Sequence, residues 1–293
     1  MKILLTGGSG FIGKNVAESY LNEKYEIVAP SRSVLDCADD ASVKNFFSHH
    51  SFDVIIHSAA KPGHRNAGDR SGILYTNSRM IVNLLNCQSS WGRLINMGSG
   101  AIYDMEHYQP KMKEEYAGTH IPLDEHGYNK YICDLLFRNY KNIVDFRIFG
   151  IFGKYEDYAI RFISNGICKT LFDLPITLRK NRKFDYLFID DLYPILDYFI
   201  VHKSNHSSYN ITPDSAIELL TVAEIIQEVG GAKNKIIVGQ DGLSSEYSGD
   251  NARLRNEFKE VKFTPIRRSI EHLFDWYQAN SAGIRKELLL IDK

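Results

Sequence analysis

The sequence has 293 residues, of which 44% are hydrophobic and 24% charged, and its formal net charge at pH 7 is -1. A chain of this length can bury a large core, as one α/β unit or as two closely joined domains. The near-neutral charge and ordinary composition do not indicate the basic surface that proteins use to bind nucleic acid or a membrane, so we expect neither partner.

The cysteines and the first residues indicate a cytoplasmic protein. The four cysteines are scattered without a C-x-x-C pair, which gives no disulfide framework and no zinc knuckle. The apolar run in MKILLTGG is too short for a signal peptide, and no apolar run of about 18 residues occurs that would span a membrane. The histidines occur without an H-E-x-x-H motif or a carboxylate cluster, so no metal site is predicted.

The first half of the sequence alternates short apolar segments with longer amphipathic ones. Strands are predicted over 2–6, 25–30, 53–60, 93–99 and 143–150. Helices are predicted over 11–23, 41–50, 72–90 and 125–141. Because parallel neighbours need a crossover long enough to hold a helix, this alternation predicts an α/β fold, a Rossmann-type doubly wound parallel sheet over 1–150.

The second half, 151–293, has a looser pattern and is predicted to form a smaller mixed α/β domain that binds substrate at the mouth of the sheet. Its expected elements are a helix near 157–170, a basic loop over 178–186, a helix near 190–202, a strand over 208–212 and helices near 221–229 and 267–279. Residues 190–212 are expected to return to the sheet of the first domain.

A glycine-rich turn, TGGSGFIG at residues 6–13, follows the first predicted strand and opens the first helix. Glycine permits unusual backbone angles and close approach of the backbone, and the start of a helix offers free N–H groups to a pyrophosphate. The spacing therefore predicts a dinucleotide site, with these contacts: Gly7, Gly10, Phe11, Ile12 and Gly13.

The end of the second strand decides which dinucleotide is bound. A carboxylate there would bind the ribose 2'-hydroxyl of NAD, whereas an arginine would favour the 2'-phosphate of NADP. The sequence has Ser31 and Arg32 at this place and no acidic residue until Asp36. We therefore favour NADP(H), with NAD as the alternative and a solvated surface arginine as the simpler explanation of Arg32.

Several motifs occur in an order that resembles the extended short-chain dehydrogenase/reductases, the NAD(P)-dependent epimerase/dehydratase family that acts on nucleotide sugars. They are TGGSGFIG (6–13), HSAA (57–60), MGSGAIYD (97–104), HGYNK (126–130), FRIFGIFG (146–153) and DYLFIDDL (185–192). Within that family the chain looks most like the 4-keto-sugar reductases and GDP-fucose synthases, because of RSVLD (32–36) and AAKPG (59–63).

The resemblance implies a set of catalytic residues. In such enzymes a serine and a tyrosine contact the C4 oxygen of the sugar, and a lysine holds the cofactor ribose and lowers the pKa of the tyrosine. Ser99 matches the serine and Lys130 the lysine, but His126 stands where the tyrosine belongs. The resemblance also implies NADPH-dependent reduction of a nucleotide-linked 4-keto-6-deoxy sugar, with further cofactor contacts at Ala59, Ala60 and Lys61.

The chain departs from the family at positions that usually contact substrate. The asparagine of the R-x-F-N segment is Gly150, and the arginine of a later segment is Phe184, with Arg182 and Lys183 beside it. We predict substrate contacts at Gly150 and phosphate contacts at Arg182 or Lys183, although a basic run is also typical of a solvated loop. Ala101 replaces the cysteine of the GDP-fucose synthases, which argues against their epimerisation step but not against reduction.

Three interpretations of His126 remain open. Its imidazole can be the proton donor, since its ordinary pKa of about 6.5 suits acid–base catalysis, although the positive charge of Lys130 would favour the neutral ring. Tyr128 or another group can supply the proton instead, but an advance of two residues turns a helix by about 200°, away from the side that Lys130 faces. Finally, His126 can be a cap or filler in a site without hydride chemistry.

Two other functions and two assembly states also remain open. One alternative is a nucleotide-sugar epimerase or dehydratase with bound NAD, and the other is a non-catalytic regulatory protein that binds a dinucleotide. The helices predicted near 72–90 and 131–140 correspond to the helices that form dimers in the family. They can equally be buried within one chain, so a homodimer and a monomer are both possible.

Overall fold

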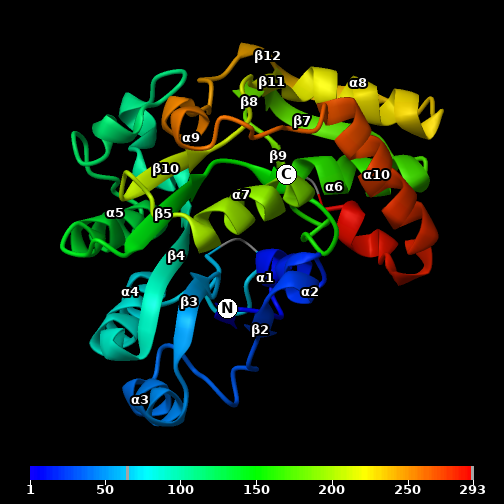
Figure 1. Cartoon of the computed structure of the whole chain (residues 1–293). Coiled ribbons are helices and arrows are strands. Elements are labelled where there is room, and N and C mark those ends of the chain that lie inside the picture. The colour runs from blue at the N-terminus through cyan, green and yellow to red at the C-terminus, as the bar shows by residue number, and fades with distance from the viewer. Residues whose placement is uncertain (64–65, 292–293) are drawn as a thin grey trace.

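A six-stranded sheet lies at the centre of the computed structural model, which describes residues 1–63 and 66–291 (Figure 1). Every strand pair in it is parallel, in the order β10-β5-β4-β3-β1-β2. The strands are β1 (Lys2–Thr6), β2 (Glu26–Val28), β3 (Phe52–His57), β4 (Trp91–Ser99), β5 (Ile143–Ile148) and β10 (Ser208–Ile211). The predicted doubly wound parallel sheet is therefore confirmed, and its sixth strand comes from the second half of the chain.

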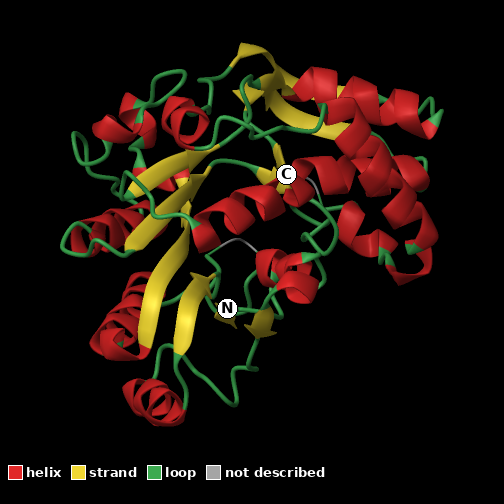
Figure 2. Ribbon diagram, in the orientation of Figure 1, coloured by secondary structure: helices red, strands yellow, loops and turns green. Residues whose placement is uncertain are grey.

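Helices cover both faces of this sheet (Figures 1 and 2). One face is covered by α3 (Asp40–His49), α4 (Ile73–Asn86) and α5 (Glu125–Phe137). The other is covered by α1 (Phe11–Ala17), α2 (Leu21–Lys24) and α7 (Ile189–Val201). None of the described helices is both long and apolar enough to cross a membrane.

The strands are apolar on both sides because successive residues point to opposite faces of the sheet. Along β1, Ile3 and Leu5 pack in the core on the α1 and α7 face, whereas Leu4 packs on the α3 and α4 face. Along β3, Ile55 belongs to the same core as Leu4. The continuous apolar segments that predicted buried strands are thus divided between two hydrophobic cores.

The remaining elements gather beyond one end of the sheet, at the top of Figure 1. They include α6 (Phe162–Leu171), α8 (Leu219–Gly230), α9 (Ala252–Glu257) and α10 (Ile266–Ala279). Three pairs of short strands accompany them: β6 (Ile151–Phe152) with β9 (Leu187–Phe188), β7 (Ile176–Asn181) with β12 (Ile236–Leu243), and β8 (Lys183–Phe184) with β11 (Ile217–Glu218). The division into domains at residue 150 stays a prediction.

Two predicted elements were wrong. The basic segment 178–186 is not a loop, because residues of β7 and β8 occupy most of it. In β7, Ile176 and Leu178 are buried, whereas Arg179 is exposed. The segment is thus an amphipathic strand, and its charged residues led to the prediction of a loop. The helix predicted over 11–23 is interrupted at Ser19, whose hydroxyl donates to the Val16 carbonyl at 2.8 Å and accepts from the Leu21 amide at 3.3 Å.

Candidate active site

The glycine-rich turn lies where the order of the strands reverses. β1 pairs with β2 on one side and with β3 on the other, so the loops after β1 and β3 leave the same edge of the sheet side by side. In open α/β sheets, ligands bind outside the carboxyl ends of the strands at such a switch point. A cavity of about 590 Å³ opens there. Seven predicted cofactor residues line it: Gly7, Gly10, Arg32, Asp36, Ala59, Ala60 and Lys61.

The glycine-rich turn has no room for side chains at Gly7 and Gly13. Gly7 has a φ of +71°, and a methyl group on it would lie 2.6 Å from the amide nitrogen of Ala59. A methyl group on Gly13 would lie 2.1 Å from the carbonyl oxygen of Gly7. Phe11, Ile12 and Gly13 belong to α1 and do not line the cavity. The glycines therefore let the two loops and the helix meet closely, as a dinucleotide cradle requires.

The two groups that would discriminate between NADP and NAD are bonded to each other. Arg32 Nε donates to Asp36 Oδ2 at 3.0 Å, and both residues line the cavity. The side chain of Arg32 is 78% exposed. Ser31 lies next to them, and its hydroxyl is hydrogen-bonded to that of Ser33 at 2.8 Å. Arg32 is thus available for the 2'-phosphate of NADP, but it is paired with Asp36, whose carboxylate would suit the 2'-hydroxyl of NAD.

The loop after β3 is fixed to α4. The Lys61 amide donates to Asn77 Oδ1 at 2.7 Å, and Asn77 Nδ2 donates back to the Lys61 carbonyl at 3.2 Å. The Lys61 ammonium pairs with Asp69 at 2.6 Å, and both residues line the cavity. One asparagine therefore holds the backbone that follows Ala59 and Ala60 in place.

Ser99 ends β4, and the start of α5 packs directly on the turn that follows it. The Ser99 hydroxyl oxygen accepts from the Ala101 amide at 3.1 Å. A methyl group on Gly127 would lie 2.5 Å from the Ala101 carbonyl oxygen, so glycine permits this approach. Asp124 caps α5 by accepting from the amides of His126 and Gly127. The structure thus brings the first turn of α5, with His126, against the turn that carries Ser99.

Lys130 lies one turn further along α5, and its charge reaches the edge of the sheet on which the cavity opens. Burial, and then the Lys130 charge, lower the pKa of His57 to about 3. His57 Nδ1 is hydrogen-bonded to the Thr6 hydroxyl at 2.8 Å, and Thr6 lines the cavity. A neutral histidine next to the glycine-rich turn is therefore within the electrostatic reach of Lys130.

His126 is exposed at the surface, yet its surroundings disfavour a positive charge. Desolvation by the surrounding protein lowers its pKa most, Lys130 and Arg161 lower it further, and Asp124 opposes them. The Tyr128 amide donates to the Asp124 carbonyl at 2.9 Å, so α5 is regular from its first turn. Tyr128, which is 39% exposed, and His126 are both exposed side chains, so the choice between them as the group near Ser99 stays a prediction.

The two departures from the family pattern are linked in space. A methyl group on Gly150 would lie 2.5 Å from the Phe184 ring and 2.4 Å from the Asp185 carbonyl oxygen, so an asparagine has no room there. Arg182 donates to the Ser245 carbonyl at 2.7 and 3.1 Å, and its guanidinium lies 5.7 Å from the Phe184 ring. Lys183 is exposed on β8. The Phe184 ring thus stands in place of the family's arginine and leaves no room for the family's asparagine at position 150.

Sequence reasoning missed several residues of this region. Arg161 acts on His126 from the residue before α6, and Tyr247 approaches Ser99 from an irregular segment near the end of the chain. Neither lies in a periodic segment or a recognisable motif. The histidine of HSAA could have been found, because a polar residue at the end of a buried strand, opposite Thr6 of β1, needs a partner.

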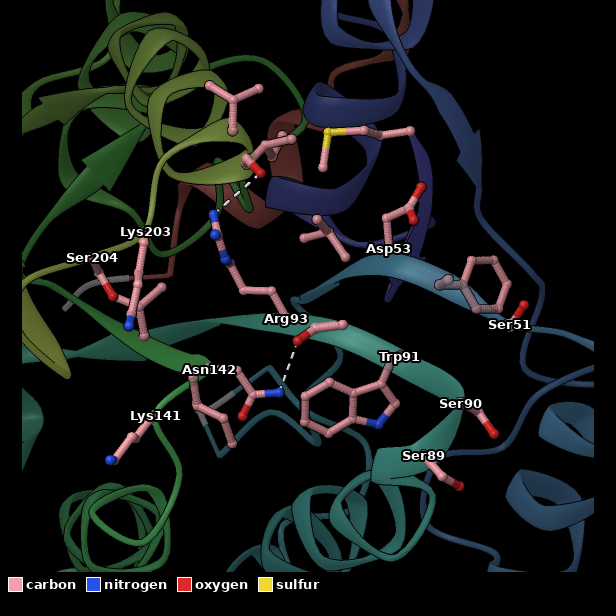
Figure 3. Close-up of a pocket in the computed structure, with 18 residues that line it drawn as sticks. Ser51, Asp53, Ser89, Ser90, Trp91, Arg93, Lys141, Asn142, Lys203 and Ser204 are labelled. Carbon is pink, nitrogen blue, oxygen red and sulfur yellow. Dashed lines mark hydrogen bonds between the residues drawn. The ribbon is translucent and has the colours of Figure 1, made fainter.

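A second hollow, of about 640 Å³, lies at the opposite edge of the sheet, around the amino ends of β3 and β4 (Figure 3). There Asn142 donates to the Gly92 carbonyl at 2.8 Å, and Arg93 donates to the Ile200 carbonyl at 3.2 Å near the end of α7. These hydrogen bonds give partners to a backbone carbonyl at the start of β4 and to one of the last carbonyls of α7. None of the predicted site residues lines this hollow.

Comparison with known proteins gives one family match. The model of the NAD dependent epimerase/dehydratase family matches residues 3–212. Among curated relatives, the GDP-L-colitose synthase of Yersinia pseudotuberculosis is 26% identical over 172 residues, which cover 54% of this chain and 56% of that protein. The chain thus spans about half of that relative. The GDP-L-fucose synthase of Dictyostelium discoideum is 24% identical over 317 residues, 97% of each chain.

A solved structure shares the fold over nearly its whole length. The GDP-mannoheptose C4 reductase of Campylobacter jejuni, determined with NADP bound, superposes with a TM-score of 0.81. It is 17% identical and covers 94% of this chain and 98% of that one. At this identity the likeness establishes the fold alone.

Proposed function

The chain belongs to the NAD-dependent epimerase/dehydratase family, and from that premise we propose that it reduces a nucleotide-linked 4-keto-6-deoxy sugar with NADPH. One observation carries the proposal: the start of α5 packs on the Ser99 turn through Gly127, at the same edge of the sheet as the cavity at the glycine-rich turn, although Ser99, His126 and Lys130 do not line that cavity. A serine, a histidine and a lysine then belong to two adjoining turns at the carboxyl edge of the sheet. Curated relatives and structural neighbours include nucleotide-sugar reductases, epimerases and dehydratases.

The cavity fits a dinucleotide. Gly7 and Gly13 let the loop after β3 and the helix α1 pack closely on the glycine-rich turn, and this tight turn at the start of a helix offers backbone N–H groups to a pyrophosphate. Arg32 supports NADPH over NADH, since its guanidinium can leave the exposed pair with Asp36 and bind a 2'-phosphate. Lys130 would hold the nicotinamide ribose. The neighbour from Campylobacter jejuni, solved with NADP bound, supports the same choice.

The proposed chemistry is hydride addition to a ketone with protonation of its oxygen. The cofactor held at the glycine-rich turn would supply the hydride for the carbonyl carbon. Ser99 donates a hydrogen bond to the carbonyl oxygen, and His126, when protonated, gives its proton to that oxygen as the alcohol forms. Desolvation, and after it Lys130 and Arg161, lower the pKa of His126, which makes its imidazolium a stronger acid but a less populated one at neutral pH.

We infer that the sugar is linked to GDP. Both curated relatives described above are named for GDP-linked sugars, and the structural neighbour is named for a GDP-linked heptose. Ala101 lies where GDP-fucose synthases have a cysteine, so we propose reduction without epimerisation. Arg182 and Lys183 remain our candidates for the diphosphate, Arg182 after release of the Ser245 carbonyl.

The experiment is a kinetic assay of NADPH oxidation with a GDP-4-keto-6-deoxy sugar. The wild type should turn over, and His126→Phe should abolish turnover while binding NADPH as tightly as the wild type. Tyr128→Phe is the matched control and should keep the wild-type rate, because Tyr128 faces away from Lys130. Full activity of His126→Phe would rule out the histidine as proton donor, and loss of activity in Tyr128→Phe would assign that role to the phenol.

The same assay separates the rival functions. An epimerase or dehydratase would retain bound cofactor through purification and convert the sugar without net consumption of NADPH. A regulatory dinucleotide-binding protein would bind NADPH without turnover, and His126→Tyr would not restore activity. Either outcome would overturn the reductase proposal.

A further inference from the structure

Tyr247 reaches the proposed active site from a segment held by backbone hydrogen bonds. The Tyr247 amide donates to the Lys183 carbonyl at 2.9 Å, and the Asp185 amide donates to the Tyr247 carbonyl at 3.1 Å. Asp185, fully buried, also accepts from the Gly249 amide at 2.8 Å. The ring of Tyr247 is buried, and it lies against the Phe184 ring with the centroids 4.9 Å apart and the planes tilted by 38°. This anchoring fixes where the phenol points.

The phenol points at the turn that carries Ser99. A methyl group on Gly100 would lie 2.8 Å from the Tyr247 hydroxyl oxygen, so the hydroxyl rests against that backbone. The hydroxyl therefore lies next to Ser99, whose side chain also influences the pKa of Tyr247. The Ser99 hydroxyl oxygen thus accepts from the Ala101 amide and has this phenol as a neighbour.

A serine hydroxyl has one proton to donate and two lone pairs with which to accept. The Ala101 amide can only donate, so it takes one lone pair of the Ser99 oxygen. If Tyr247 also donates, both lone pairs are taken and the Ser99 proton is left for the substrate. If Ser99 donates to Tyr247 instead, its only proton is lost to the carbonyl oxygen.

We propose that Tyr247 is a positioning residue that donates its hydroxyl proton to Ser99 and so directs the Ser99 proton at the carbonyl oxygen of the substrate. The inference rests on the proposed reductase function and adds a residue to that site. Burial raises the pKa of Tyr247, which keeps the phenol protonated and able to donate. The same shift makes Tyr247 a poor proton source, so the task of proton transfer stays with His126.

The test is a double-mutant cycle on kcat with NADPH and the GDP-4-keto-6-deoxy sugar. Ser99→Ala should lower kcat about 100-fold, as loss of one hydrogen-bond donor to a developing oxyanion does. Tyr247→Phe should lower kcat about tenfold with KM unchanged, because the interaction strengthens only in the transition state. Since Tyr247 acts through Ser99, adding Tyr247→Phe to Ser99→Ala should cause no further loss. Losses that multiply, or a wild-type kcat in Tyr247→Phe, would overturn the proposal.

Tyr108→Phe is the matched control, because the Tyr108 hydroxyl donates to the Ser248 carbonyl at 2.9 Å in the same aromatic cluster. It should melt at the same temperature as Tyr247→Phe and keep the wild-type kcat. If the wild type has no turnover, the reductase function fails, and crystal structures with NADPH decide the positioning role separately. The Ser99 side chain should hold one rotamer in the wild type and several in Tyr247→Phe. The same single rotamer in both would contradict the proposal.

Discussion

Arg32→Gln should weaken the binding of NADPH and leave the binding of NADH nearly unchanged. Only NADPH presents a 2'-phosphate to the wall of the cavity that Arg32 occupies. Glutamine keeps the length and polarity of the side chain but removes the charge, so the change isolates the electrostatic contribution of the guanidinium.

The size of the effect follows from the bonds made and broken. A hydrogen bond to a charged group contributes about 1.5–3 kcal/mol. Arg32 must first leave Asp36, and an exposed pair at this i,i+4 spacing contributes about 0.3–0.5 kcal/mol. The net loss is about 1–2.5 kcal/mol, which weakens NADPH binding roughly 5- to 70-fold. Asp36→Asn should have the opposite effect, strengthening NADPH binding about twofold by releasing the arginine.

The assay is calorimetric titration of each variant with NADPH and with NADH at one fixed ionic strength, since salt screens exposed charges. Arg179→Gln is the control, because Arg179 is exposed on β7 and does not line the cavity. An equal loss of affinity for both cofactors in Arg32→Gln, or no loss for NADPH, would refute the assignment of Arg32 to the 2'-phosphate.

Three further predictions concern pH, stability and the glycine-rich turn. The rate of reduction should fall about tenfold per pH unit once the pH exceeds the pKa of His126, which is lowered from its ordinary value. In a pH–rate profile, Arg161→Gln should move this fall to higher pH, because it removes a positive charge that lowers the pKa. Asp134→Asn should lower the free energy of unfolding in urea by about 3–5 kcal/mol, because it removes the closer of the two carboxylates paired with the buried Arg147, Asp134 at 2.6 Å against Asp145 at 3.8 Å. Gly13→Ala should abolish NADPH binding in the same titration while circular dichroism shows a folded protein, since its methyl group would lie 2.1 Å from a backbone oxygen of the turn.

Much of the sheet could be predicted because its signals are local. The apolar strands and the glycine spacing are each contained in short segments, and the order of strands and helices follows from them. The strand β7 was missed because two consecutive charged residues, the exposed Arg179 and the half-buried Lys180, interrupt its apolar alternation, and because its partner, β12, lies more than 50 residues further along the chain. Pairing at that distance leaves no trace in a local pattern.

The site was predictable only in part for a similar reason. Ser99, His126 and Lys130 stand in motifs, so their places could be expected, whereas their roles depend on neighbours from distant segments. Arg161 and Tyr247 contribute charge and a hydroxyl from segments without periodicity. Their positions are set by tertiary contacts, which no spacing in the sequence records.

The most direct test of the account is a crystal structure of the protein with NADPH and a GDP-linked sugar. The account predicts the pyrophosphate against the turn of Gly7 to Gly13 and the Lys130 ammonium at the nicotinamide ribose. It also predicts Ser99 and His126 within about 3 Å of the oxygen on C4 of the sugar. A dinucleotide bound elsewhere, or a Lys130 side chain that points away from the bound cofactor, would contradict it.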